Sequence, residues 1–407
     1  MSPDYRMSPV ELRSSMALSL ILFLRMLGLF LILPVFALYA EDLGDATPTL
    51  VGLALGIYGL TQALLQIPFG MISDRLGRKP VIVAGLLIFV AGSIIAGLGD
   101  SIYTVILGRA LQGAGAIAAA VIALAADLTR DNQRSKTMAM IGISVGVAIS
   151  IAFVGAPILN TYIGVPGLFF MAAGLALLAI VVLLGLVPTP EKIQVSSTPG
   201  HTDNRLLNVL TNPVLLQLYI GIFVLHMLIM TTFVVLPLSL RDIAGLATAQ
   251  HWHVYLPVLL ISALLMMPCI IISERYNKAL LIFIMAIGLL ALSQFGLYGW
   301  HYTVMQITIS MTLFFLAFNY LEAMLPSLIS RVAPAQDKGT ALGVYYTSQF
   351  IGIFLGGVTG GAIHEHYGLE DVFLFGGIIA CCWLLACLLL PAPELTSRRE
   401  ESGSSGV

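Results

Sequence analysis

The sequence predicts an all-α membrane protein with twelve transmembrane helices arranged in two pseudo-symmetric six-helix bundles, and three observations lead to this prediction. Apolar residues make up 58% of the chain and charged residues only 10%, whereas soluble domains are about 45–50% apolar and about 25% charged. The apolar residues are gathered in runs that reach the length of about 20 residues needed to cross a bilayer. The two halves of the 407-residue chain also repeat one another, which indicates two related bundles.

The apolar runs define the expected helices. Runs of this length cross lipid as helices, because the strands of a membrane barrel would be about half as long and would alternate between apolar and polar residues. The predicted spans are residues 16–40, 48–72, 80–98, 101–127, 137–160, 164–187, 214–240, 251–273, 279–299, 301–330, 338–363 and 369–391.

A polar segment divides these spans into six and six. Residues 188–213 contain prolines, serines and a glycine, which are typical of a linker. We therefore expect an N-terminal six-helix bundle over residues 1–187 and a C-terminal six-helix bundle over residues 214–396. Residues 397–407 are polar and rich in glycine and serine, and we interpret them as a remnant of an expression vector or a frayed tail.

The two halves share short patterns at corresponding positions. In the second and eighth spans, a proline precedes a serine, an acidic residue and an arginine at the same spacing. The matching positions are Pro68 and Ser73-Asp74-Arg75 with Pro268 and Ser273-Glu274-Arg275, Arg25-Met26-Leu27 with His226-Met227-Leu228, and Pro34 with Pro237. Because the matches occur in the same order, they indicate a common helical plan for both halves.

The basic residues predict the orientation of the chain. Sixteen of the 19 Lys and Arg residues fall on one predicted side of the membrane, and only Arg241 lies in a loop on the other side. The remaining two, Arg25 and Arg109, lie inside spans. Since cytoplasmic loops carry an excess of Lys and Arg, we expect both termini and the linker to lie in the cytoplasm.

A short, densely charged turn joins the second and third predicted spans. It runs from Gly70 to Lys79, and its ionisable groups require water at a membrane face. The G-x-x-x-D-R-x-G-R-K pattern of this turn resembles the signature loop between the second and third helices of major facilitator superfamily transporters. An ordinary basic loop with a chance pair of glycines is the alternative. The pattern is carried by Gly70, Asp74, Arg75, Gly77, Arg78 and Lys79.

Further stretches resemble motifs of the same superfamily. Gly108-Arg109-Ala110-Leu111-Gln112-Gly113 in the fourth span is similar to its arginine motif, and Leu33-Pro34-Val35 in the first span resembles a motif of its twelve-helix drug exporters. In the fifth span the Gly-Pro pair of the antiporter motif is split into Gly155-Ala156-Pro157, which weakens an assignment as an antiporter. Over its whole length the chain resembles drug/proton antiporter-like members, which implies the major facilitator fold and a monomer.

The resemblance implies a gate at the cytoplasmic face. It brings the charged turn near the start of the eleventh span, at about residues 338–343, where the N-terminus of a helix attracts a carboxylate. We hypothesise that Gly70, Asp74, Arg78 and Asp127 hold the cytoplasmic side shut, with Arg78 pairing to Asp127. A role in setting the topology alone is the alternative for the basic residues of the turn.

The resemblance also implies a central cavity lined by spans 1, 4, 7 and 10. We expect polar residues from these spans to converge on it, since a charge at mid-bilayer costs at least about 2.5 kcal/mol and faces a partner or water. Histidine and glutamate are both able to carry a coupling proton. The alternatives are salt bridges that only join helices and a neutral, hydrogen-bonded histidine. The candidate proton-coupling or substrate residues are Arg25, Arg109, Gln112, His226, Asn319 and Glu322.

These features predict a proton-coupled secondary active transporter that exports small molecules or drugs across the bacterial inner membrane. A proton-coupled importer of a sugar or metabolite is one alternative, and a non-transporting receptor or lipid-interacting protein on the same scaffold is another. An enzyme is disfavoured, because the sequence contains no nucleophile–base pair, metal-ligand cluster or phosphate-binding loop. We expect no cofactor, metal or nucleic-acid partner. The expected partners are a small-molecule substrate, protons and membrane lipid.

Overall fold

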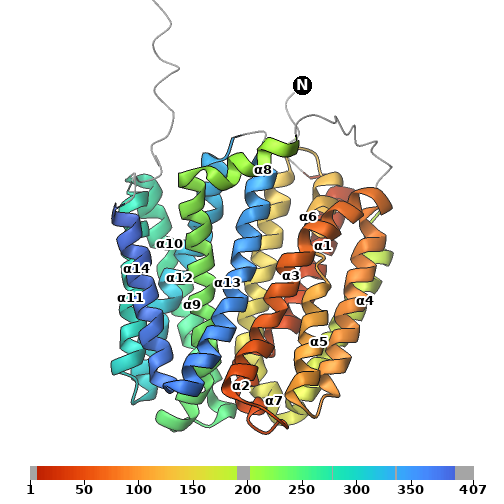
Figure 1. Ribbon diagram of the computed structural model, residues 1–407. Helices are drawn as coiled ribbons and strands as arrows, with labels where there is room; N and C mark the ends of the chain where they lie inside the picture. The colour runs from red at the N-terminus through yellow and green to blue at the C-terminus, as the bar shows by residue number, and fades with distance from the viewer. Residues whose placement is uncertain (1–6, 190–201, 277, 335–336, 390–407) are drawn as a thin grey trace, which may run out of the picture.

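The computed structural model describes residues 7–189, 202–276, 278–334 and 337–389, and the regular secondary structure of these residues is helical (Figure 1). Eleven helices in the described residues are long and apolar enough to cross a membrane. One of them joins two helices across a kink, so twelve spans result. The predicted all-α membrane fold is confirmed.

The N-terminal half contains six spans, two of which are broken into separate helices. The first span begins earlier than predicted, because Ser8 and Glu11 form a capping box that starts the helix at Pro9. The fourth span is interrupted at residues 115–117. The helices are α1 (Pro9–Phe30), α2 (Leu33–Ala40), α3 (Pro48–Leu76), α4 (Arg78–Gly97), α5 (Ile102–Ala114), α6 (Ala118–Asp127) and α7 (Arg134–Leu186).

The fifth and sixth spans follow one another without a loop. Helix α7 is interrupted only at Gly164, whose φ of 65° is a left-handed conformation that glycine adopts without steric cost. The chain turns back there, because both ends of α7 lie at the same end of the molecule. Arg130, just before α7, pairs with Glu11 of α1, and Val187, just after α7, accepts a hydrogen bond from Lys79. The predicted division between the fifth and sixth spans is therefore present, but the turn lies at Gly164 and residues 161–163 are helical.

The C-terminal half follows the predicted spans closely, and the predicted bounds 279–299 of the ninth span are those observed. Side-chain caps explain two of the helix starts, since Asn212 caps α9 and Thr303 caps α12. The helices are α9 (Pro213–Leu238), its π-helical extension η1 (Ser239–Ile243), the short η2 (Thr248–Gln250), α10 (Trp252–Arg275), α11 (Ala279–Gly299), α12 (Val304–Val332), α13 (Lys338–His366) and α14 (Leu369–Leu389).

The predicted polar linker contains a helix. Helix α8 (Thr202–Thr211) lies across the end of the bundle at which α1 begins (Figure 1). It exposes Leu206, Leu207 and Leu210, so this half of the linker is amphipathic rather than uniformly polar. The other half of the linker and the predicted tail at residues 397–407 lie outside the described residues.

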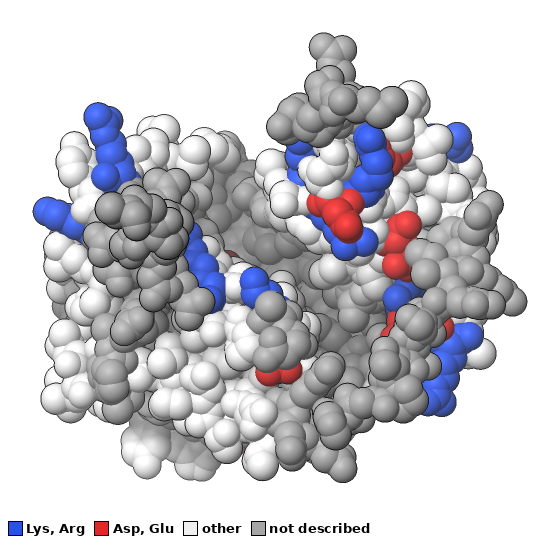
Figure 2. Space-filling view, turned by 90° about the horizontal axis from the view of Figure 1, so that it is seen from above, with Lys and Arg blue, Asp and Glu red and all other residues white. Residues whose placement is uncertain are grey.

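The two ends of the bundle differ in charge. The basic end, seen face on in Figure 2, carries the loops at residues 75–79 and 128–134 together with Arg331. The acidic end carries the loops at residues 41–47 and 241–248, where Arg241 is the only basic residue. This segregation agrees with the side that the sequence predicts for each loop.

Candidate functional site

The charged turn between α3 and α4 is held by contacts within the N-terminal half. Gly77 has a φ of 96°, which favours glycine at the point where one helix ends and the next begins. Arg78 donates hydrogen bonds from Nε to Asp127 at 3.1 Å and from Nη1 to Ser73 Oγ at 2.7 Å, and it also pairs with Asp74. The predicted pairing of Arg78 with Asp127 is therefore present.

The predicted contact between Asp74 and the start of α13 is not made in this conformation. The side chain of Asp74 is 51% exposed, and its ion pair among the described residues is with Arg78 in the same turn. A side chain added at Gly339 or Gly343 would meet nothing within 4 Å. The first turns of α13 thus stand clear of neighbouring elements at these positions.

The other residues of the turn also contact the N-terminal half or solvent. Lys79 Nζ donates a hydrogen bond to the carbonyl oxygen of Val187 at 2.5 Å. Arg75 is exposed. A Cβ added at Gly70 would lie 3.7 Å from the Ala119 side chain. The turn is therefore anchored on one half of the molecule.

Arg25 is fully buried inside the N-terminal half. The break between α5 and α6 frees backbone carbonyl groups from helical hydrogen bonds, and Arg25 Nη2 donates to the carbonyl oxygen of Gly115 at 2.9 Å and to Gln62 Oε1 at 3.0 Å. Its guanidinium group lies 5.8 Å from the centroid of the Phe89 ring, within the range of a cation–π interaction. Arg25 thus joins α1 to α3 and to the broken fourth span.

Arg109 is also buried in the N-terminal half. Its Nη1 donates to Gln112 Oε1 at 2.8 Å, and its Nε donates to the Ala54 carbonyl oxygen at 3.3 Å. Gln112 in turn donates to Ser93 Oγ at 2.8 Å. The guanidinium group of Arg109 lies 5.5 Å from the Tyr58 ring centroid. Arg109 and Gln112 therefore connect α3, α4 and α5.

A separate polar cluster lies in the C-terminal half. His226 on α9 is 7% exposed, and its Nε2 atom lies 2.7 Å from the side-chain nitrogen of Gln349 on α13 and 3.8 Å from Glu322 Oε2 on α12. We assign the neutral tautomer in which Nδ1–H donates to the Ile222 carbonyl oxygen at 3.3 Å, because Nε2 then accepts from Gln349. Three helices thus contribute to one cluster.

Glu322 is the partly exposed acidic member of this cluster. It lies about 15 Å along the helix from the end of α12 at Val332, yet its side chain is 39% exposed. Its buried Oε2 atom has no hydrogen-bond partner among the described residues. Nearby, Asn319 donates to Ser262 Oγ at 3.3 Å and so joins α12 to α10.

The predicted convergence of four charged or titratable residues is therefore only half observed. His226 and Glu322 lie together, whereas the hydrogen bonds described for Arg25 and Arg109 end on groups of the N-terminal half. Both arginines satisfy backbone carbonyl groups that sequence alone does not reveal. Gln62 is the side-chain partner of Arg25, and Gln349 is the side-chain partner of His226.

The acidic end is closed by contacts between the halves. Arg241 donates to both carboxylate oxygens of Glu41 at 2.6 and 3.0 Å and also pairs with Asp242. The Thr49 N–H group donates to Glu365 at 3.0 Å. These contacts were not predicted. The isolation of Arg241 among acidic loops was the available signal, but the sequence did not identify its partner.

Glycines bring the halves into backbone contact near the same end. A Cβ added at Gly52 of α3 would lie 2.1 Å from the Gly357 carbonyl oxygen of α13, and one added at Gly56 would lie 2.7 Å from the Phe354 carbonyl oxygen. Rows of small residues allow such close approach of membrane helices. The α3–α13 seam therefore depends on the absence of side chains.

An aromatic cluster also joins the two halves. The Phe153 ring of α7 lies 4.8 Å from the Phe233 ring of α9, 6.0 Å from the Tyr255 ring of α10 and 6.1 Å from the Phe315 ring of α12, measured between centroids. Such edge-on arrangements are favoured between aromatic rings. The cluster packs one helix of the N-terminal half against three helices of the C-terminal half.

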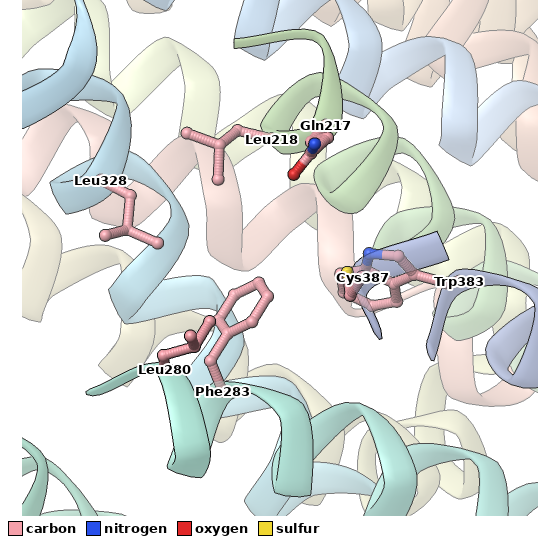
Figure 3. Close-up of a pocket in the computed structure, with 7 residues that line it drawn as sticks. All are labelled: Gln217, Leu218, Leu280, Phe283, Leu328, Trp383 and Cys387. Atoms are coloured by element: carbon pink, nitrogen blue, oxygen red, sulfur yellow. The ribbon is translucent and has the colours of Figure 1, made fainter. Parts of the chain in front are cut away.

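The basic end is hollowed between its two groups of charged side chains (Figure 2). A separate cavity inside the C-terminal half, with Phe283, Leu328 and Trp383 in its wall, is shown in Figure 3. Its volume is about 20 Å³, little more than the roughly 10–15 Å³ that a cavity needs to hold one water molecule. This internal cavity is too small for a substrate.

Comparison with known proteins places this geometry in a family. The family model described as Major Facilitator Superfamily matches residues 18–326 and 247–406. The inner membrane transport protein YajR of Escherichia coli is 46% identical over 394 residues, which cover 97% of this chain and 87% of that protein. The multidrug resistance protein MdtH of Aeromonas hydrophila is 28% identical over 84% of this chain and 86% of its own length.

Solved structures share the fold at low sequence identity. A bacterial homologue of the human lysosomal transporter Spinster, in an inward-facing and occupied conformation, has a TM-score of 0.78 and 13% identity, covering 94% of this chain and 97% of its own. A D-xylose–proton symporter has a TM-score of 0.77 and 17% identity, covering 95% of this chain and all of its own. At such identities the likeness concerns the fold alone.

Proposed function

The chain belongs to the Major Facilitator Superfamily of membrane transporters, and from this premise we propose that it is a proton-coupled secondary active transporter that exports small molecules by alternating access. The cluster of His226, Gln349 and Glu322 carries the proposal, because it places two titratable groups side by side on three helices. The relative named as a multidrug resistance protein supports the direction of export.

Proton coupling follows from the chemistry of this cluster. When Glu322 is ionised, it attracts a cationic group or a proton to a poorly solvated site, where an uncompensated charge is costly. When Glu322 is protonated, that attraction is lost and a bound cationic or polar substrate is released. A proton and a substrate therefore compete for the same carboxylate. Because only one of them is bound at a time, the proton crosses the membrane in one direction and the substrate in the other.

The sides of the membrane are assigned from the charges. We place the basic end in the cytoplasm, with both termini on that side, because cytoplasmic loops are rich in Lys and Arg. The description of the Escherichia coli relative as an inner membrane protein supports location in the bacterial inner membrane. In this assignment the observed conformation is closed outward and hollowed toward the cytoplasm, and a monomer contains the complete cluster.

The experiment that tests this function is reconstitution of the native chain into liposomes that contain a pH-sensitive dye. Candidate substrates are added outside, and the proton movement that accompanies each one is recorded. An exchanger moves protons against the substrate, and this is the expected result. Proton movement in the same direction as the substrate would identify an importer instead. The absence of substrate-dependent proton movement and of substrate uptake would indicate a non-transporting protein.

We propose that the charged turn between α3 and α4 acts as the gate at the basic end. When the hollow closes, Asp74 moves from its exposed position to the N-terminus of α13, where helix dipole and free N–H groups stabilise the carboxylate. Arg78 and Asp127 hold the turn in the conformation that presents Asp74, while Gly70 leaves room for the approach. Arg75 and Lys79 fix the turn at the cytoplasmic face.

The Asp74→Asn variant is expected to favour the conformation with the basic end open. A contact worth about 1–3 kcal/mol shifts a two-state population about 5–150-fold. The reporter is a single cysteine introduced at Tyr346, a partly exposed residue of α13 that lies close enough to Glu322 to interact with it electrostatically. Its alkylation rate is measured in a chain whose four native cysteines are replaced, with reagent applied from the basic side under conditions that close this end. Faster alkylation is expected.

The matched control is Asp131→Asn at the same end, since Asp131 pairs with Arg134 three residues away and its side chain is 87% exposed. This control is expected to leave the alkylation rate unchanged. An unchanged rate in Asp74→Asn as well would remove Asp74 from the gate.

A further inference from the structure

A second cavity lies on the seam between the halves at the acidic end, away from the His226 cluster. Its volume is about 210 Å³, which is room for a small organic molecule, since one water molecule occupies about 30 Å³ in the liquid. One wall comes from the N-terminal half, with Ala37, Glu41 and Val51, and the other from the C-terminal half, with Val234 and His364. The cavity therefore exists only while the acidic end is closed.

The walls combine apolar surface with negative charge. Alanine, valine, leucine and proline side chains supply most of the lining, and Glu41 supplies a carboxylate. The carboxylates of Glu41, Asp242 and Glu365 all lie close enough to His364 to interact with it electrostatically. Arg241 is the basic residue paired with two of these three acids. The local excess of negative charge favours a cation.

Two polar groups of the cavity wall are able to bind such a cation. Each carboxylate oxygen has two lone pairs, so Glu41 retains acceptor capacity after it accepts the hydrogen bonds of Arg241. His364 Nδ1 is buried and has no hydrogen-bond partner within the part of the chain that the structure describes. Because the ring torsion of histidine is broad, a modest rotation brings this nitrogen to a donor in the cavity.

We propose that this cavity binds a small alkylammonium ion, with the ammonium group between Glu41 and His364 and the alkyl chain against the apolar wall. The ion contacts both halves, so it binds the closed acidic end and not the open one. A ligand that binds one of two conformations shifts the population toward that conformation. Alkylammonium ions supplied from the acidic side therefore hold this end closed and slow the conformational cycle.

The test is calorimetric titration of the purified full chain at pH 8 with n-butylammonium chloride, using n-butanol as the uncharged control of similar shape. Binding of n-butylammonium and no measurable binding of n-butanol are expected. The His364→Ala and Glu41→Gln variants are expected to weaken binding at least about tenfold, equivalent to about 1.4 kcal/mol. His253→Ala, which removes an exposed histidine at the same end, is expected to bind like the native chain.

The dependence on conformation is tested with Gly52→Leu, in which the added side chain would meet α13 and keep the seam apart. This variant retains Glu41 and His364 and is expected to lose binding. No binding to the native chain, equal binding of n-butanol, or unchanged binding in both His364→Ala and Gly52→Leu would overturn the proposal. Binding is read without transport, so the result is independent of whether the chain exchanges protons.

Discussion

The Gly52→Leu variant is expected to transport about 100-fold more slowly than the native chain while remaining folded in the membrane. In the native chain a Cβ at this position would lie 2.1 Å from the Gly357 carbonyl oxygen and 2.9 Å from the Gly361 Cα atom. Overpacking costs about 1–3 kcal/mol, and backbone atoms on both sides leave little freedom to relax. A penalty of about 3 kcal/mol corresponds to about 150-fold in a conformational equilibrium.

The overpacking penalty falls only on the conformation with the acidic end closed. We therefore expect a large effect on transport and a small effect on folding. Closing the acidic end brings α3 against α13, whereas opening it separates these helices. The rate is measured in proteoliposomes, together with the alkylation of cysteines near the acidic end. Gly174→Leu is the matched control, because Gly174 is exposed and a side chain there would meet nothing within 4 Å. Native transport by Gly52→Leu would contradict the requirement for a closed seam in the transport cycle.

The Glu322→Gln variant is expected to lose substrate-driven proton movement. Glutamine keeps the size and hydrogen-bonding ability of the side chain but cannot ionise, so the competition between proton and substrate disappears. Glutamine also resembles the protonated carboxyl group, so substrate binding is expected to weaken. At a raised substrate concentration, equilibrium exchange without a proton gradient is expected to continue, because the protein is still able to change conformation. This division between coupling and movement separates a proton-carrying role from a merely structural one.

His226→Ala tests the neighbouring group in the same assay. Removing the imidazole takes away the group 3.8 Å from Glu322 Oε2 and the acceptor for Gln349, so we expect proton movement to be weakened. Asp42→Asn at the exposed acidic end is the control and is expected to behave like the native chain. Normal substrate-driven proton movement in both Glu322→Gln and His226→Ala would show that the coupling residues lie elsewhere.

The fold was predictable because the bilayer imposes a simple length rule. Helix α11 has the predicted bounds, since an apolar run of about 20 residues has few other arrangements in lipid. Backbone conformation was less predictable. The break at residues 115–117 occurs inside an apolar run, where hydropathy does not change. The reversal between the fifth and sixth spans was predicted, but its formation by a single glycine, Gly164, was not.

The site was predictable in its residue types but not in its grouping. Arg25 was correctly identified as a charge inside a span, but its partner is the Gly115 carbonyl oxygen, which is available because the fourth span is broken there. Spans that are apolar on every face do not reveal how each helix is rotated. The pairing of Glu41 with Arg241 likewise joins residues that are 200 positions apart, and sequence pattern gives no rule for such a contact.

Rocking of the two halves is tested by measuring two distances in one experiment with spin labels. In a chain whose native cysteines are replaced, one pair of labels is attached at Asp100 and Trp300 of the acidic end and another, in a second sample, at Asn132 and Arg331 of the basic end. All four positions are exposed. When substrate or a change of pH is applied to the reconstituted protein, we expect the acidic-end distance to increase while the basic-end distance decreases. Distances that stay fixed, or that increase and decrease together, would contradict alternating access by this chain.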